Sequence, residues 1–364
     1  MMTLGRLMVG CCVLFLHLEW YVRDVNGGSL KFKALNLFPE SFDWDPVHDR
    51  MLLSSMSKGT ISELDTGSGT VKEFVRDEEL AGKVASGGMI VDSRRNRVVH
   101  ALHDIVGWRF GGVAAYDLDT GRRLFFARLD NVGVVEGELS CANDVAVDFN
   151  TGNAYVTNCR GSFLWKVTEE GTPSVFVKDD SFTSQPSLFD ETPWCSFNGI
   201  VHDQNKYLLA VQTNSGALFR VDVDDRSVHL VAMQERLPGA DGMVLRDDGA
   251  LVIVSSRKVW LVRSTSNWID ANIVDAIPLN PSDYSTGAAL KGRSTFIVHA
   301  HLPDMFANRT REEFELQEIN FPSEVPDNNH PTLLIVLVVL AAVIVLLWRL
   351  KMGKLYDQNL RKRA

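Results

Sequence analysis

The sequence has few of the residues that would build a zinc site or a disulfide network. Five cysteines are spread over 364 residues, and two of them, Cys11 and Cys12, lie in an apolar segment near the N-terminus. The other three are Cys141, Cys159 and Cys195, an odd number that cannot all pair and whose spacing matches no zinc motif. One disulfide and a set of free buried thiols are both compatible with this pattern.

Two familiar catalytic signatures are missing as well. The chain contains no Gly-x-Ser-x-Gly nucleophile elbow, and its nine histidines form neither His-Glu-x-x-His nor another zinc pattern. The net charge of −9 argues against a nucleic-acid-binding surface, so we expect no nucleic-acid partner. With 45% hydrophobic and 23% charged residues the composition is globular, and an acidic protein of this kind can hold a cation.

Long apolar runs are confined to the two ends of the chain. Residues 7–18 follow Arg6 and have the length of a signal-peptide core, so we assign residues 1–28 to a signal peptide or signal anchor, cleaved or retained. Residues 332–348 carry no charge, and as a helix they would rise about 25 Å, enough to cross a thin bilayer. This segment predicts a C-terminal transmembrane helix; a buried core helix is the alternative.

The flanks of this apolar segment predict its orientation. Basic residues follow it in the tail, residues 349–364, and acidic residues precede it in residues 312–327. The positive-inside rule then predicts a cytosolic tail and a luminal or extracellular domain. A glycosylation sequon at Asn308 fits that side. We expect a single-pass membrane protein of the secretory pathway, in the ER or at the cell surface, with residues 323–331 as the linker.

Between residues 29 and 322 the chain has no convincing amphipathic helix, only short β-branched and aromatic runs separated by Gly, Asp and Asn turns. Six segments share one pattern: a polar or glycine pair, a mostly apolar stretch, a turn and a buried run. They begin at Glu40, Gly87, Asn143, Asn198, Asp241 and Thr286. The spacing of roughly 43 to 56 residues suits a four-stranded blade with its loops. The repeat predicts an all-β, six-bladed β-propeller.

Individual strands and loops of this propeller can also be placed. In the first unit, residues 59–65 and 70–77 read as two strands around a glycine-containing turn. The sixth unit runs out of local strands, so we expect residues 314–321 and 29–37 to join in one blade and close the ring. The loops at residues 103–112 and 181–194 exceed the usual connection length, which is typical of functional loops.

The first residue of each unit predicts a metal site on the propeller axis. Inner strands of all blades line the central channel, so residues in the same phase converge there. Four of the six carry side-chain oxygens suited to calcium, whereas zinc would prefer His or Cys. These are Glu40, Asn143, Asn198 and Asp241. A calcium ion that only holds the blades together is the alternative to a catalytic one.

Further residues around this site have predicted roles in the chemistry. A bound ion can act as a Lewis acid while a carboxylate accepts the proton of the attacking water. Asp241 is our candidate for this base, and Asp144 is a supporting carboxylate beside the ligands. His103 is a candidate proton shuttle, although a structural histidine is the alternative.

The repeat units resemble the senescence-marker-protein/gluconolactonase superfamily, whose relatives include paraoxonases, calcium-dependent phosphotriesterases and strictosidine-synthase-like proteins. The resemblance covers about residues 36–302. It rests on Pro39-Glu40, Asn143-Asp144, Asn198-Gly199 and Asp241-Gly242. The sequences of residues 142–158, 198–212 and 240–249 are similar to those of a plant and algal branch of this superfamily. The resemblance implies one catalytic divalent ion, usually calcium, on Glu40, Asn143, Asn198 and Asp241, and hydrolysis of lactones, aryl esters or organophosphates.

One departure from the family changes the expected substrate. Sugar-lactonase relatives commonly carry a substrate-contacting arginine two residues before the first metal-binding Asn, where this chain has Cys141, so Cys141 is a candidate supporting or substrate-contacting residue. Phe197, Trp194 and Trp108 near the mouth would suit a more hydrophobic ester or lactone. We therefore expect a membrane-anchored, calcium-dependent hydrolase of a small-molecule substrate. A non-catalytic scaffold with a structural calcium and a strictosidine-synthase-like condensing enzyme are the alternatives.

Overall fold

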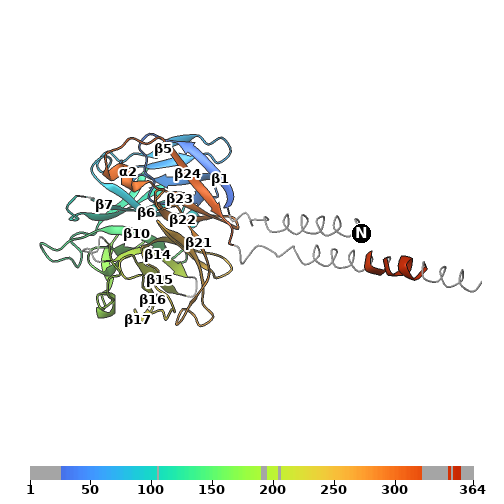
Figure 1. The fold of residues 1–364 in the computed structure, drawn as a ribbon. Helices are drawn as coiled ribbons and strands as arrows, with labels where there is room; N and C mark the ends of the chain where they lie inside the picture. The colour runs from blue at the N-terminus through green and yellow to red at the C-terminus, as the bar shows by residue number, and fades with distance from the viewer. Residues whose placement is uncertain are drawn as a thin grey trace, which may run out of the picture. The chain divides into compact units, whose positions relative to one another are not determined.

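The strands of the first part of the chain form a six-bladed propeller, as predicted (Figure 1). The computed structural model describes residues 26–104, 106–189, 195–203, 206–321, 343–345 and 347–353. The chain divides into two compact units, Met1–Pro322 and Ser323–Ala364. Within the described part of the first unit, the strands form six four-stranded antiparallel sheets.

Five of the sheets are consecutive in the sequence. They consist of β2 (Phe42–Asp45), β3 (Arg50–Ser54), β4 (Ile61–Leu64) and β5 (Val71–Val75); β6 (Ala85–Asp92), β7 (Arg97–His103), β8 (Gly111–Asp117) and β9 (Arg123–Arg128); β10 (Ala142–Val147), β11 (Ala154–Asn158), β12 (Phe163–Val167) and β13 (Pro173–Val177); β14 (Phe197–Asp203), β15 (Tyr207–Gln212), β16 (Leu218–Asp222) and β17 (Val228–Leu230); and β18 (Ala240–Leu245), β19 (Leu251–Ser255), β20 (Lys258–Arg263) and β21 (Asn272–Pro278). Each is one blade, and β4 and β5 confirm the strands predicted in the first unit.

The sixth blade combines the two ends of the propeller. Its order is β22 (Ser285–Lys291), β23 (Ser294–His299), β24 (Glu313–Ile319) and β1 (Asn26–Lys33). In Figure 1, β1 and β24 lie side by side, and their register pairs Phe32 with Phe314, whose rings stack at 6.1 Å. The predicted joining of the N-terminal and C-terminal strands is therefore confirmed. Backbone hydrogen bonds between strands from the two ends of the propeller therefore close the ring.

The burial of the strands explains the repeat seen in the sequence. The second strand of a blade is covered by neighbouring blades on both faces, so all five residues of β11 and of β19 are buried and apolar runs replace strict alternation. The outer strand β21 alternates between exposed and partly buried residues. The core lies between blades: Val99 of β7 and Trp165 of β12, for example, belong to one apolar cluster. Each repeat is thus buried by its neighbours.

A short helix and two 3₁₀ turns complete the described structure of the first unit. The helix α2 (Leu302–Phe306) follows β23, and the 3₁₀ turns η1 (Ser93–Arg95) and η2 (Asp180–Phe182) lie in loops. In the second unit, residues 343–345 and 347–353 are helical. No helix among the described residues is long and apolar enough to span a membrane. Most of the predicted span, the predicted linker 323–331 and residues 1–25 lie outside the described residues.

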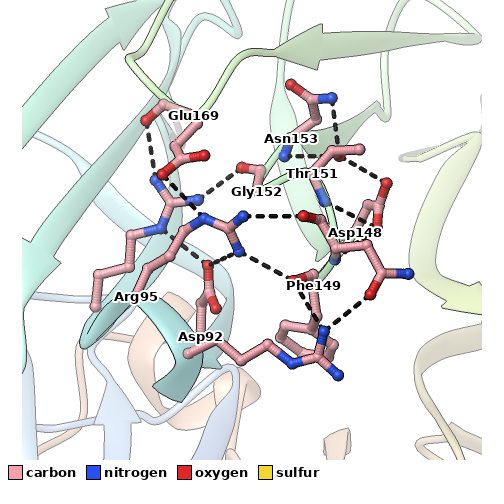
Figure 2. Close-up of polar contacts among 11 residues, drawn as sticks. Asp92, Arg95, Asp148, Phe149, Thr151, Gly152, Asn153 and Glu169 are labelled. Atoms are coloured by element: carbon pink, nitrogen blue, oxygen red, sulfur yellow. Dashed lines mark hydrogen bonds and ion pairs between the residues drawn. The ribbon is translucent and has the colours of Figure 1, made fainter.

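A polar network joins the second and third blades at the far end of their inner strands (Figure 2). Arg97, only 4% exposed, donates to Asp92 Oδ2 at 3.1 Å and to the carbonyl oxygens of Gly152 at 2.6 Å and Glu169 at 2.9 Å. Arg95 donates to the carbonyl oxygen of Phe149 and pairs with the Glu169 carboxylate at 3.0 Å. The guanidinium groups thereby hydrogen-bond backbone carbonyls of the neighbouring blade.

Replacing Arg97 with methionine is expected to lower the free energy of unfolding by about 3 kcal/mol, because the buried Asp92 carboxylate loses its shorter ion pair, at 3.1 Å, and keeps only the one to Arg95 at 3.5 Å. The matched control is Arg94→Met. Arg94 is exposed and donates to Asn150 Oδ1 at the same junction, so its loss should cost less than about 1 kcal/mol. Urea unfolding of the two variants measures the difference; equal stability losses would contradict a dominant role for the buried arginine.

Candidate functional site

The four residues predicted to bind a metal line a single cavity of about 590 Å³. Glu40 lies two residues before β2, and the other three lie at the start of β10, β14 and β18. They share the cavity wall with Thr286 of β22, whose hydroxyl donates to the Glu40 carbonyl at 2.6 Å. The side chains that share a phase in the sequence therefore meet in space, and the Thr286 hydrogen bond joins the last blade to the first.

Glycines let the inner strands come this close. A Cβ at Gly87, the second phase position, would overlap the backbone carbonyl oxygen of Asn143, and a Cβ at Gly88 would overlap the Asp144 carboxylate. A Cβ at Gly242 would lie 2.5 Å from the carbonyl oxygen of Thr286. The phase position that offers no side-chain oxygen is thus a glycine because the neighbouring strand occupies that space.

Two oxygens of the predicted ligands have no protein partner. Glu40 Oε2 and Asn143 Oδ1 are buried and accept no hydrogen bond from any described residue. Asn198 is oriented differently: its Nδ2 donates to Thr213 Oγ1 at 3.1 Å, and that hydroxyl donates to the Ala240 carbonyl at 2.7 Å. The amide nitrogen of Asn198 is thereby fixed on the Thr213 side. Buried acceptors without a donor are costly, and a bound cation would satisfy them.

The carboxylates of the site repel one another. Burial raises the pKa of Glu40 well above its usual range, and the charges of Asp241 and Asp144 raise it further. The pKa of Asp241 is likewise raised, first by burial and then by Asp144, although a hydrogen bond from Asn198 opposes the shift. These shifts mean that the site prefers either protons or a cation to ionised carboxylates alone.

The donor set suits a hard cation better than a soft one. Among the described residues, no three His, Cys, Asp or Glu side chains are grouped closely enough to hold a metal by themselves. An ion at this site would therefore need the amide oxygens of Asn143 and Asn198 as well as the carboxylates of Glu40 and Asp241. Two carboxylates with two amide oxygens fit calcium, whose coordination is completed by water.

Asp144 lies on the other side of this ring of oxygens. It lines a second cavity of about 220 Å³, which shares Glu40 and Asn198 with the larger one. Its carboxylate accepts hydrogen bonds from the backbone N–H groups of Val145 at 2.8 Å and Ile200 at 3.0 Å. Burial nevertheless raises the pKa of Asp144 to about 7. Asp144 therefore ties the third blade to the fourth and acts on the ligands through its charge.

His103 lines the large cavity, and His100 does not. The Nδ1 atom of His103 lies 3.1 Å from the carbonyl oxygen of Ala142, which can only accept, so Nδ1 carries the proton. Its ring stacks on Trp108, also in the cavity wall, with centroids 6.0 Å apart. Burial lowers the pKa of His103, which keeps the ring neutral near pH 7.

One sequence-based expectation about the cavity wall, that of Phe197, is wrong. Cys141 is fully buried and is not among the residues that line the cavity, and its supporting role stays a prediction. Phe197 points the other way from its neighbour Asn198, because successive side chains of a strand alternate, and its ring packs against Phe182 at 4.7 Å. Trp194 lies outside the described residues. Asn308 is exposed, and its glycosylation stays a prediction.

Several cavity residues were not predicted because they come from the outgoing end of the second strands. Met56 follows β3, Cys159 follows β11, Thr213 and Asn214 follow β15, and Ser256 and Arg257 follow β19. His103, the last residue of β7, lies at the same end of its strand, and it was predicted. The repeat carries this signal too, since these residues occupy similar positions after each buried run. Phe189, Tyr284, Leu302 and Phe306 add apolar and aromatic surface from loops and α2.

Three free thiols gather beside the cavity. Cys141, Cys159 and Cys195 are all unpaired and form one buried cluster against Trp108. The Cys195 thiol donates to the Phe197 carbonyl oxygen at 3.1 Å. Burial alone would raise the pKa of Cys159, but its neighbours Cys141 and Cys195 and the positive charge of Arg160 outweigh burial and lower the pKa. The sequence was compatible with one disulfide or with free thiols, and the structure has free thiols.

Without a bound cation the protein should lose stability as pH rises. Burial raises the pKa of Asp144 to about 7 and that of Asp43 to about 6. A carboxyl whose folded pKa exceeds its unfolded value binds its proton more tightly in the folded state. Its contribution is therefore complete below about pH 4 and is lost as pH rises to about 7. For Asp144 the loss is at most about 4 kcal/mol.

Thermal melts of the chelated protein between about pH 5 and pH 8 test this expectation. The melting temperature should fall across this range. Asp144→Asn should flatten the curve, because the titrating group is gone, and calcium should restore stability most at the alkaline end. A melting temperature that rises with pH in the chelated wild type would contradict the assignment.

Comparison with known proteins supports the fold. No protein-family model matches the chain, and no curated protein is significantly similar to it. The allergen Mala s 1 of Malassezia sympodialis has a TM-score of 0.69 at 17% identity, covering 81% of this chain and 96% of that one. A luciferin-regenerating enzyme has a TM-score of 0.55 at 13% identity, covering 81% and 97%. A gluconolactonase of Xanthomonas campestris has a TM-score of 0.51 at 15% identity, covering 79% and 90%.

At such identities these likenesses establish the fold alone. They confirm the propeller fold that the repeat predicts, a fold that this chain shares with a gluconolactonase. The plant and algal branch, the metal and the substrate stay predictions.

Proposed function

We propose that this chain is a calcium-dependent hydrolase of lactones or esters, phosphotriesters included, anchored to a membrane by residues 332–348. The observation that carries the proposal is the pair of buried, unpartnered oxygens, Glu40 Oε2 and Asn143 Oδ1, in the wall of a cavity large enough for a small molecule. Glu40, Asn143, Asn198 and Asp241 would hold the ion. A calcium ion bound there would polarise the carbonyl or phosphoryl oxygen of the substrate.

The chain's own side chains supply the proton transfers in this proposal. Asp241 accepts the proton of the attacking water in this proposal. His103 is the candidate proton shuttle: with Nδ1–H committed to the Ala142 carbonyl, its other ring nitrogen is free to accept a proton and pass it on. Asp144 holds the fourth blade in register and raises the basicity of Asp241 through its charge.

The cavity wall favours a substrate with an apolar part. Met56, Trp108, Phe189, Leu302 and Phe306 line it together with the polar groups. These side chains would bury the apolar part of an ester, while the ion and its ligands bind the reacting group. A polar sugar lactone would make few contacts with this apolar surface. Cys141, at the position of the family's arginine, does not line the cavity.

A substrate panel tests the proposal directly. The full-length chain in detergent, with calcium, is assayed on aliphatic lactones, aryl esters and a phosphotriester, before and after chelation. We expect turnover of at least one class, lost on chelation and recovered with calcium. A calcium-loaded, folded protein that is inert on the whole panel would overturn the hydrolase and favour a scaffold with a structural ion.

A further inference from the structure

The thiol cluster lies at the junction of the third and fourth blades, and the backbone holds it there. The N–H of Cys159 donates to the Cys141 carbonyl at 3.0 Å, which extends the β10–β11 ladder. The Cys159 carbonyl accepts from Ser196 at 2.7 Å, so the residue next to Cys195 is fastened to the same point. Cys159 therefore sits between one thiol of its own blade and one of the next blade.

Only part of this cluster is within reach of a solute. Cys159 and Cys195 line the large cavity, whereas Cys141 does not. Cys159 is 2% exposed, so a reagent reaches its sulfur through the cavity and not from the outer surface. The cavity admits small molecules and excludes bulky thiol proteins by size.

The surroundings of Cys159 favour the reactive, deprotonated form of a thiol. Cys159 packs with Cys141 and Cys195 in one buried cluster against Trp108. Arg160 lies next in the chain with its guanidinium 5.6 Å from the Trp108 ring. Nearby positive charge makes a cysteine more nucleophilic, and the Arg160 charge contributes to the lowered pKa of Cys159.

We propose that Cys159 is a peroxide-reactive thiol and that Cys195 resolves it into a disulfide joining the third and fourth blades. In the first step the Cys159 thiolate attacks the peroxide: an S–O bond forms, the O–O bond breaks, and one oxygen leaves as hydroxide. The sulfur is oxidised to a sulfenic acid and the peroxide is reduced. In the second step the Cys195 sulfur attacks this sulfenic sulfur, losing its proton, and water leaves.

Such a disulfide would affect the predicted metal ligands, because Cys195 precedes the ligand Asn198 by three residues. The thiol chemistry itself needs no calcium and no ester, so it stands apart from the proposed hydrolase. An inert enzyme with an active thiol pair would leave this inference intact.

The test uses the full-length chain, chelated so that hydrolase chemistry is silent, and treated with stoichiometric hydrogen peroxide. Remaining thiols are alkylated and the peptides are mapped by mass spectrometry, which separates the cluster from Cys11 and Cys12. We expect a Cys159–Cys195 cross-link. We also expect Cys159 to react at least about tenfold faster than free cysteine at neutral pH.

Three variants separate the roles. Cys195→Ser should let a 1,3-dicarbonyl reagent trap sulfenic acid at Cys159, Cys159→Ser should abolish both products, and Cys141→Ser should keep the cross-link. Circular dichroism checks that each variant is folded; because Cys195→Ser alone tests the trapping step, the inference remains falsifiable if Cys159→Ser misfolds. A cross-link to Cys141 instead, or a Cys159 that reacts no faster than Cys195, would overturn the proposal.

Discussion

Asp241→Asn is expected to lower kcat/KM for the hydrolysis reaction by about three orders of magnitude. The substitution removes a ligand charge and the proposed proton acceptor at once, and a general base alone contributes about 10²- to 10⁴-fold. The hydrogen bond from Asn198 and the repulsion from Asp144 both act on this carboxylate, so its loss also changes the electrostatics of the whole ring of ligands.

The matched control is Asp247→Asn in the exposed hairpin that follows the same strand, β18. It changes charge by the same amount, lies outside the cavity wall, and should leave turnover within about twofold. The melting temperature of chelated Asp241→Asn should be no lower than that of the chelated wild type, because one of the mutually repelling buried carboxylates is gone. A folded Asp241→Asn protein with wild-type kcat/KM would refute the assigned role.

Gly87→Ala should destabilise the fold by more than about 4 kcal/mol, or prevent folding. Its Cβ would overlap the Asn143 carbonyl oxygen, which is backbone and cannot rotate away. Relief would require the inner strands of the second and third blades to separate, and separation would displace Asn143 from the ligand ring. Steric failures of this kind, which neighbouring atoms cannot relieve, are among the causes of losses this large.

Gly28→Ala serves as the comparison, since Gly28 lies in the outer strand β1. The closest atom to its Cβ would be the Glu318 carboxylate, at an ordinary 3.5 Å, and the side chain of Glu318 is flexible. We expect a change within about 0.5 kcal/mol there. A Gly87→Ala protein that unfolds at the same urea concentration as wild type would contradict this close approach of the inner strands.

Much of the fold is readable from the sequence because each blade buries the same runs. The six phased segments predicted the blade number, and the missing strands of the last segment predicted that β1 pairs with β24. Both follow from one physical fact: a blade cannot bury its inner strands alone, so the pattern repeats and the ring must close.

The cavity was predicted only in part. Their shared position at the start of the repeat units brings Glu40, Asn143, Asn198 and Asp241 to one cavity, as expected. It does not say which way a flanking side chain points, so Phe197 was placed in a wall that it does not reach. The large loops and α2 follow no repeat, and their contribution to the wall depends on tertiary packing that no local pattern encodes.

Calcium titration of the full-length, chelator-stripped chain by calorimetry tests the central claim most directly. The account predicts one strong calcium site in the wild type that depends on the cavity ligands. It also predicts that Glu40→Gln weakens this site by at least about a hundredfold, and that wild-type affinity increases with pH as the raised carboxyl pKa values are passed. Calcium binding of unchanged affinity in Glu40→Gln, or none in the folded wild type, would contradict it.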